Sequence, residues 1–275
     1  MEWRHAVSPF LRSVSGRAGK ARRWNRPERM RRLLPFAALA IALLAWEGLV
    51  RWQRYAPFIL PSPGRVWARF LAVARDGTLW WHTQITLLEV AAGLALGLSV
   101  AMLLGYGLAK SPTLEQMLSP YIVASQAIPA VAIAPLLIIW FGFGGLSKVL
   151  TCALTVFFPA LVNTVVGLRS VEEDLVMLMR SLGASRWQRF TLLEVPAALP
   201  VLLGGLKVGV TLAVIGAVVG EFVGADRGLG FLINLSRGIF DTPLLFVALF
   251  TLVAIALALY GAVHWLESRL LIWRG

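Results

Sequence analysis

Long apolar runs, repeated along the chain, most constrain what this sequence can fold into. A run of about 20 apolar residues is long enough to cross the hydrocarbon core of a bilayer as an α-helix. Hydrophobic residues make up 58% of the chain, charged residues only 15%, and the mean hydropathy is +0.75, which disfavours a soluble domain. We therefore predict an all-α integral membrane protein with six transmembrane helices, near Leu33–Val50, Thr86–Ala109, Tyr121–Phe141, Val149–Leu168, Ala197–Val219 and Leu244–Trp265.

The distribution of Lys and Arg predicts the orientation in the membrane. Most of the 26 Lys and Arg lie in the N-terminal tail, between spans four and five, and after span six. Cytosolic loops are enriched in these residues, so both termini are expected in the cytosol. Fewer lie in the opposite connections, among them Lys148, Arg227 and Arg237. Topology and contact with anionic membrane lipid explain the net charge of +12 better than nucleic-acid binding does.

Few charged residues fall within the predicted spans. Glu47 and Glu89 lie near helix ends, where solvation at the interface is favoured over a role in a transport pathway. Lys207 lies deeper, and its long stem either snorkels to the interface or faces the interior of the bundle. The single cysteine, Cys152, is expected to be a small buried packing residue.

Polar side chains at membrane depth are candidates for contact with a solute. Pro129 and Pro135 each remove a backbone donor from span three, which predicts a kink there. Kinked helices often line cavities. The candidate pathway residues are Gln126, Asn163, Thr164 and Lys207, and interhelical hydrogen bonding is the favoured alternative for the first three.

Small residues recur every four positions in two of the spans. Such spacing lets helix backbones approach closely in lipid, so these positions are predicted packing faces rather than binding sites. They are Gly93, Gly97, Ala101 and Gly105 in span two, and Gly216, Gly220 and Gly224 around the end of span five.

A polar island, residues 171–200, separates spans four and five. Its apolar residues recur at i, i+3, i+4 and i+7, which predicts a short amphipathic helix. Acidic residues stand at the start of this helix, and Gly183 stands where a left-handed turn commonly ends one. We predict a compact cytosolic knob whose apolar face is formed by Leu175, Leu178, Met179 and Leu182.

The motifs of several enzyme classes are missing from the sequence. It contains no G-x-x-x-x-G-K-[ST] phosphate-binding loop, no H-E-x-x-H and no G-x-S-x-G. The three histidines lie outside the spans or near their ends. No catalytic residue, metal site or cofactor is therefore predicted, and energy for any transport must come from another subunit.

The island resembles the cytosolic coupling loop of permease subunits in type I binding-protein-dependent ABC importers. That loop follows the pattern E-A-A, three residues, G, nine residues, I, any residue, L-P. Gly183 matches the glycine and Pro196 the proline, whereas Met177–Met179 stand at the E-A-A positions. The similarity extends over about residues 82–267 to the sulfonate, taurine, nitrate and vitamin-precursor branch, as in GEFVGADRGLG, Gly220 to Gly230.

The resemblance implies a division of the chain and a set of partners. The basic cytosolic tail would be residues 1–32, span one 33–50, an extracytoplasmic connection 51–81, the permease domain 82–267 with its coupling loop 171–196, and the C-terminal tail 268–275. The implied partners are a cytosolic ABC ATPase dimer that uses ATP and Mg, an extracytoplasmic solute-binding protein and a second permease copy, all at the inner membrane. The implied ATPase-coupling residues are Arg180, Ser181, Leu182, Gly183, Ala184, Ser185, Arg186 and Pro196.

Substrate and rival functions stay open at this level. The tracts Val123–Leu137 and Ser181–Gly209 look most like permeases for vitamin-type solutes, riboflavin or a thiamine pyrimidine precursor. Sulfonate, taurine or nitrate import is the alternative within the same class. A channel that works without an ATPase, or a membrane enzyme, is a remote alternative, because the sequence shows no series of charges that could form a ring.

Overall fold

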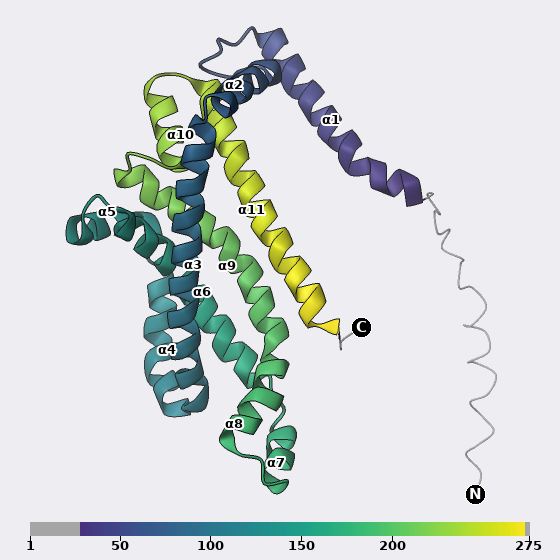
Figure 1. Ribbon diagram of the computed structural model, residues 1–275, viewed down its shortest axis with the longest axis vertical. Helices are drawn as coiled ribbons and strands as arrows, with labels where there is room; N and C mark the ends of the chain where they lie inside the picture. Colours follow the sequence, from purple (N-terminus) through teal and green to yellow (C-terminus); the bar gives the residue numbers. More distant parts are fainter. Residues whose placement is uncertain (1–27, 273–275) are drawn as a thin grey trace, which may run out of the picture. The chain divides into compact units, whose positions relative to one another are not determined.

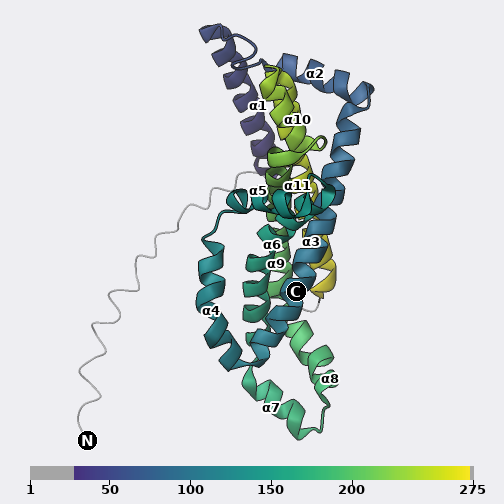
Figure 2. The same cartoon turned by 90° about the vertical axis from the view of Figure 1, so that its left-hand side faces the viewer.

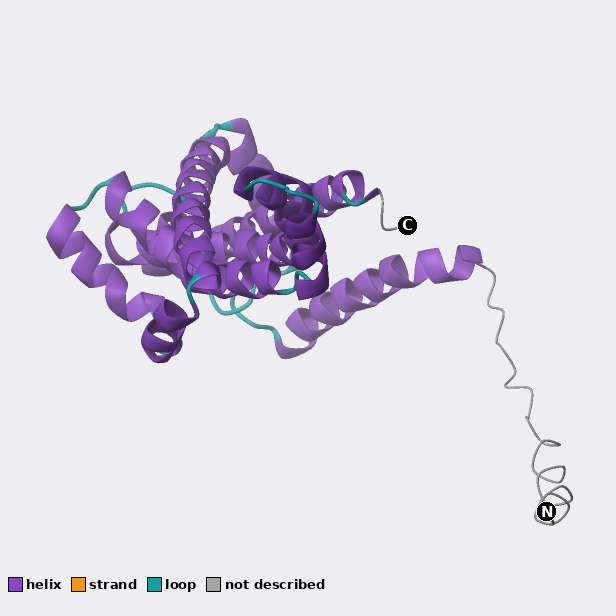
Figure 3. Cartoon of the chain, turned by 90° about the horizontal axis from the view of Figure 1, so that it is seen from below, coloured by secondary structure: helices purple, strands orange, loops and turns teal. Residues whose placement is uncertain are grey.

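The computed structural model describes residues 28–272, and their regular structure is helical throughout (Figure 3). The chain divides into two units, Met1–Gln53 and Arg54–Gly275, which are described separately. The predicted basic tail, residues 1–32, lies almost wholly outside the described residues, as does the chain end, 273–275.

The first unit contains one described helix, α1 (Glu28–Gln53). The part from Leu34 to Gln53 is long and apolar enough to cross a membrane, as predicted for span one. Glu47 accepts a hydrogen bond from Arg51 at 2.6 Å, one turn further along the helix. Its charge is thus balanced near the helix end, consistent with the interfacial position expected for it.

The second unit carries the remaining helices. The segment predicted to couple to an ATPase, α7 and α8, is called the coupling segment below and lies at one end, and α2 and α10 lie at the opposite end (Figures 1 and 2). The elements are α2 (Pro63–Arg75), α3 (Thr78–Lys110), α4 (Pro112–Gln126), α5 (Ala130–Phe141), α6 (Gly145–Arg169), α7 (Glu173–Ser181), α8 (Arg186–Arg189), the π-helical turn η1 (Phe190–Glu194), α9 (Val195–Gly224), α10 (Leu229–Gly238) and α11 (Thr242–Leu270).

Four of the helical segments in this unit are long and apolar enough to span a membrane: α3, α6, α11 and the continuous stretch Arg186–Gly224. Span three bends where the prolines predicted a kink, but more sharply than a single kinked helix would. The chain breaks between α4 and α5, which meet at 95° and form either one broken span or a re-entrant loop. Pro129 lies at the break with extended backbone angles (φ −64°, ψ 130°), and because it has no N–H it cannot continue the hydrogen bonding of α4. Pro135 lies inside α5 without interrupting it.

The core of the unit is the close packing of α3, α6 and α9. A Cβ atom added to Gly97 of α3 would lie 2.6 Å from the carbonyl oxygen of Ala153 in α6. On the other side of α6, a Cβ atom at Gly216 of α9 would lie 2.8 Å from Cα of Cys152, which is fully buried. The predicted small-residue packing faces are confirmed, and they let three backbones pack directly against one another.

Two short helices occupy connections for which no helix was predicted. Helix α2 lies within the connection 51–81, and Arg69 on it forms an ion pair with Asp241 at 2.7 Å. Asp241 also caps α11 by accepting a hydrogen bond from the backbone N–H of Leu244 at 3.2 Å. Helix α10 follows α9 after a turn at Gly228, whose φ is +107°. The end of the bundle opposite the coupling segment is therefore ordered by its own small helices.

Candidate functional site

The island between spans four and five forms the predicted amphipathic helix, α7. Glu173 and Asp174 lie in its first turn, where carboxylates favour the positive end of the helix dipole. Gly183 follows with φ +73°. Its N–H donates to the carbonyl of Arg180, and the N–H of Ala184 donates to the carbonyl of Met179, each at 3.0 Å. This pair of hydrogen bonds is a Schellman motif, which ends the helix sharply at the glycine.

A second cap fixes the return of the chain. The hydroxyl of Ser185 accepts a hydrogen bond from the backbone N–H of Gln188 at 3.2 Å, and the side chain of Gln188 accepts one from the backbone N–H of Ser185 at 2.8 Å. This reciprocal capping box starts α8, which continues through η1 into α9. Pro196 occupies the first turn of α9, directly after η1. The segment is therefore a rigid extension of α9.

The apolar face of α7 is uncovered. No residue of α7 is buried, and Leu175, Leu178 and Leu182 are 41%, 53% and 73% exposed. Arg180 and Arg186 form no ion pair within the described part of the chain. A cluster of exposed apolar residues next to free arginines is typical of a surface that binds a partner.

One ion pair holds the base of this segment against the bundle. Lys110, at the end of α3, lies 2.5 Å from Glu194 in η1. Nearby, Arg169 at the end of α6 pairs with Glu115 of α4. The first pair ties α3 to the continuous passage from α8 into α9, and the second ties α4 to α6.

The predicted pathway residues do not come together. Gln126 is exposed at the end of α4. Asn163 donates to the carbonyl of Pro159 at 2.9 Å and packs against Gly205 of α9, while Thr164 is buried and donates to the carbonyl of Ala160 at 2.7 Å. Lys207 faces α11, where it pairs with Glu267 and lies 3.3 Å from Nδ1 of His264. Their positions do not define a single solute site.

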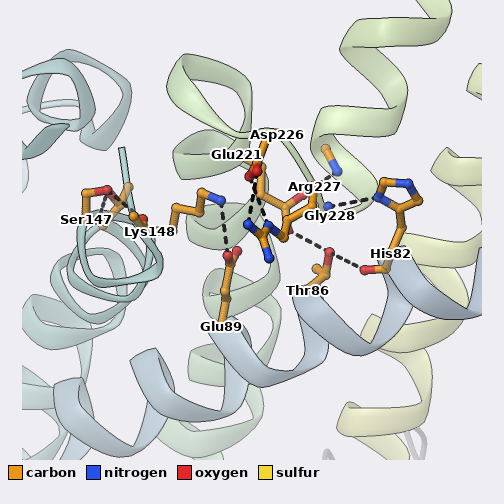
Figure 4. A network of polar contacts seen from close by, with 12 residues as sticks. His82, Thr86, Glu89, Ser147, Lys148, Glu221, Asp226, Arg227 and Gly228 are labelled. Atoms are coloured by element: carbon orange, nitrogen blue, oxygen red, sulfur yellow. Dashed lines mark hydrogen bonds and ion pairs between the residues drawn. The ribbon is translucent and has the colours of Figure 1, made fainter. Parts of the chain in front are cut away.

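A buried charge cluster at the other end of the bundle was missed (Figure 4). Glu89 of α3 faces Lys148 of α6, with Nζ 3.5 Å from Oε1, and both side chains are less than a tenth exposed. The prediction that Glu89 is solvated at the interface was wrong, and so was the placement of Lys148 in a connection. The reason is that α3 and α6 each begin earlier than expected, at Thr78 and Gly145.

Glu221 of α9 is the second carboxylate of this cluster. Its Oε1 accepts a hydrogen bond from the hydroxyl of Thr86 on α3 at 2.6 Å, and its Oε2 accepts one from the backbone N–H of Gly230 in α10. The hydroxyl of Thr86 accepts in turn from the N–H of Leu229 at 2.8 Å. Span five was predicted to end at Val219, two residues before Glu221, so the acidic residue was not recognised as buried.

The cluster holds the loop between α9 and α10 in place. Nδ1 of His82 accepts a hydrogen bond from the N–H of Gly228 at 3.0 Å (Figure 4). At the exposed tip, Arg227 forms two hydrogen bonds to Asp226, each of 3.0 Å, and these lower the pKa of that carboxyl below its ordinary value. Among the described residues no group of His, Cys, Asp and Glu could hold a metal ion. The arrangement positions the backbone of this loop through His82, Thr86 and Glu221.

Comparison with known proteins adds the family context. The family model described as "Binding-protein-dependent transport system inner membrane component" matches residues 93–272. The chain is 51% identical to the riboflavin transport system permease protein RibX of Chloroflexus aurantiacus, covering 86% of this chain and 88% of that protein. It is 38% identical to the formylaminopyrimidine transport permease protein ThiX of Halalkalibacterium halodurans, covering 88% and 96%.

More distant relatives extend the same picture. The chain is 31% identical to the taurine transport system permease protein TauC of Escherichia coli, covering 92% of this chain and 94% of that protein. A solved structure of the MetNI methionine ABC transporter in an inward-facing conformation matches with a TM-score of 0.60 at 18% identity, covering 68% of this chain and 93% of that one. At that identity the structural match concerns the fold alone.

Proposed function

The chain belongs to the family of inner membrane components of binding-protein-dependent transport systems, as a multi-pass permease of an ABC importer, and on this premise we propose that it imports riboflavin or a closely related vitamin-type solute. The observation that carries the proposal is the 51% identity to the riboflavin permease over 86% of the chain. Identity falls to 38% for the formylaminopyrimidine permease and to 31% for the taurine permease. Import of a thiamine pyrimidine precursor, or of taurine, sulfonate or nitrate, ranks behind it.

The coupling segment is the part of the chain that the ATPase would displace during its ATP hydrolysis cycle. We propose that the open apolar face of α7, together with Arg180, Ser181, Leu182, Gly183, Ala184, Ser185 and Arg186, docks into a groove on a cytosolic ATPase dimer that uses ATP and Mg. Two caps and the continuous passage through η1 into α9 support this role, because a rigid segment transmits displacement where a flexible loop would absorb it. Pro196 marks the point where the segment enters α9.

The remaining assignments follow from this docking. With α7 and α8 in the cytosol, α2 and α10 lie on the extracytoplasmic side, where a solute-binding protein would deliver its ligand (Figure 1). Both termini are assigned to the cytosol, with residues 82–267 as the permease domain. Closure of the ATPase dimer would shift the helix bundle between inward and outward openings, and two copies of the chain would form one pathway. The protein itself performs no catalysis under this proposal.

Uptake by the complete system tests the substrate. The permease, its ATPase and its binding protein are expressed together in a riboflavin auxotroph, and growth is measured on limiting riboflavin. Growth is expected, and it should disappear when the ATPase is inactivated. Failure to import either riboflavin or a thiamine pyrimidine precursor, with uptake of labelled taurine instead, would reassign the substrate without affecting the family.

A substitution at Gly183 tests the coupling assignment. Nothing lies within 4 Å of a Cβ atom placed at Gly183, so Gly183→Trp should leave the fold of the bundle intact. Its positive φ and its bulk should nevertheless prevent the segment from docking, so the ATPase should no longer copurify. Gly107→Trp, which is also unobstructed but lies on α3, serves as the control. If the ATPase still copurified with Gly183→Trp as it does with the wild type, the coupling assignment would be contradicted.

A further inference from the structure

An apolar groove lies between the bundle and the coupling segment. It has a volume of about 640 Å³ and is formed by α3, α6, α8, η1 and α9. Its α3 side includes Leu103, which is 75% exposed, and its α8 side includes Trp187, which is 70% exposed. Tyr106 and Phe190 pack edge to face between them, with ring centroids 5.3 Å apart. The groove therefore opens to the surroundings of the bundle along a membrane-spanning helix.

Positive charge without a protein partner lies at one end of the groove. Arg186 lines the groove and forms no ion pair in the described part of the chain. The Nε atom of Arg189, one residue before η1, is buried and has no hydrogen-bond partner. Glu194 in the same segment pairs with Lys110 through Oε1, and its Oε2 is buried without a hydrogen-bond partner. An unpaired guanidinium group, that of Arg186, therefore lines an apolar groove, and a buried guanidinium nitrogen without a partner lies three residues further along α8.

We propose that this groove binds one anionic glycerophospholipid, with an acyl chain along Leu103 and Phe190 and its phosphate at Arg186 and Arg189. Guanidinium groups form paired hydrogen bonds with phosphate oxygens, and basic pockets between membrane helices on the cytosolic side are suited to anionic headgroups. Trp187 stands where indole rings are commonly found, at the boundary between hydrocarbon and water. The assignment to the cytosolic leaflet rests on the proposed function, whereas the binding itself does not.

A lipid fits the groove better than the other occupants do. A transported solute would need polar groups converging on it, and apart from Arg186 the lining is almost entirely apolar or aromatic. A docked ATPase would cover α7, none of whose residues lines the groove, and of the proposed docking residues only Arg186 is shared with the groove. A bound lipid would contact α3, α8 and α9 at once and so fasten the coupling segment to the bundle. The lining residues are Met102, Leu103, Tyr106, Thr164, Leu168, Arg186, Trp187, Phe190, Val195, Ala198, Leu199 and Leu202.

Native mass spectrometry of the full-length protein in detergent tests the proposal. After delipidation the protein is titrated with phosphatidylglycerol or with phosphatidylcholine of the same acyl chains. One phosphatidylglycerol per chain is expected to bind at least ten times more tightly than phosphatidylcholine. Arg186→Gln and Arg189→Gln should each weaken this preference about fivefold. Arg237→Gln, which removes an exposed arginine of α10 outside the groove, should leave the preference unchanged.

Filling the groove gives a second, independent arm. Leu103→Trp should abolish retention of the lipid, whereas Leu88→Trp, at an exposed position in a different groove on the same helix, should not. Soluble glycerol phosphate at the same concentration should displace none of the bound lipid, because it lacks an acyl chain. Equal retention of the two lipids by the wild type, or an unchanged preference in the two arginine variants, would overturn the proposal. The measurement involves neither ATPase nor solute, so the lipid proposal can fail while the transport assignment holds, and the reverse.

Discussion

Lys148 of α6 and Glu89 of α3 form an ion pair inside the helix bundle, with Nζ 3.5 Å from Oε1 and side chains 4% and 7% exposed. Glu221 adds a second buried carboxylate to the same region, where it binds a threonine hydroxyl and a backbone N–H. Buried charges are costly unless they are paired, and removal of one partner leaves the other uncompensated. The pair therefore fixes how α3 and α6 meet, and it gives a direct test of the structure.

Breaking this ion pair should destabilise the protein strongly. Lys148→Met leaves Glu89 buried without a cation, which typically costs about 3–5 kcal/mol. For a domain of this size we expect the Tm in detergent to fall by about 10 °C. Adding Glu89→Leu to Lys148→Met should recover most of the loss, since neither charge then remains unpaired. A Tm for Lys148→Met equal to that of the wild type would contradict the burial described here.

Removing the Glu221 carboxylate should loosen the hairpin between α9 and α10. Glu221→Ala deprives the Gly230 N–H of its acceptor, at a cost of about 1–3 kcal/mol, and leaves the Thr86 hydroxyl with only the carbonyl of His82, at 3.3 Å. Arg227 at the exposed tip should then be cleaved faster by trypsin in limited proteolysis. Glu172→Ala, at an exposed position on the coupling segment, is the control and should leave that cleavage rate unchanged. Equal cleavage in both variants would mean that Glu221 does not hold the hairpin.

Two glycines of α3 should respond in opposite ways to the same substitution. The Cβ atom of Gly97→Ala would meet the backbone of α6 at 2.6 Å, so the helices must separate, at a cost of about 1–3 kcal/mol. Gly107→Ala meets nothing within 4 Å and should be neutral or slightly stabilising, because alanine favours the helix. The comparison is made by thermal unfolding of the two variants in the same detergent. Similar midpoints would contradict the close packing of α3 and α6.

The capping box of the coupling segment gives a local prediction. Ser185→Ala removes the acceptor for the N–H of Gln188 and should weaken α8 by about 1 kcal/mol. Ser181→Ala is the matched control, because that hydroxyl only donates to the carbonyl of Leu178 within its own helix. Hydrogen exchange at the amides of α8 should become faster in Ser185→Ala and stay unchanged in Ser181→Ala. Slow exchange in both variants would mean that the cap contributes little to the order of the segment.

Local patterns predicted the coupling segment well. The amphipathic spacing around Leu178, the early acidic residues and Gly183 each concern neighbours within a few residues, and the structure reproduces the helix and its left-handed end. The small-residue faces were also predictable, since close approach of helices in lipid depends on side-chain size at fixed spacing. The proline break in span three was located but its angle was not, because the direction of α5 after Pro129 depends on what it packs against.

The sequence by itself determined that this chain builds membrane-spanning helices. It also determined where glycine lets these helices approach and where a capped polar segment interrupts them. All of these features depend on composition and short-range spacing. Only the tertiary structure decided which charges meet. Thr86 and Glu221 are 135 positions apart and still hydrogen-bonded, a pairing that no local pattern contains. The exact ends of the helices also decide which charges meet. The predicted span boundaries lay close to Glu89, Lys148 and Glu221. A shift of a few residues in such a boundary turns a solvated charge into a buried one that must find a partner.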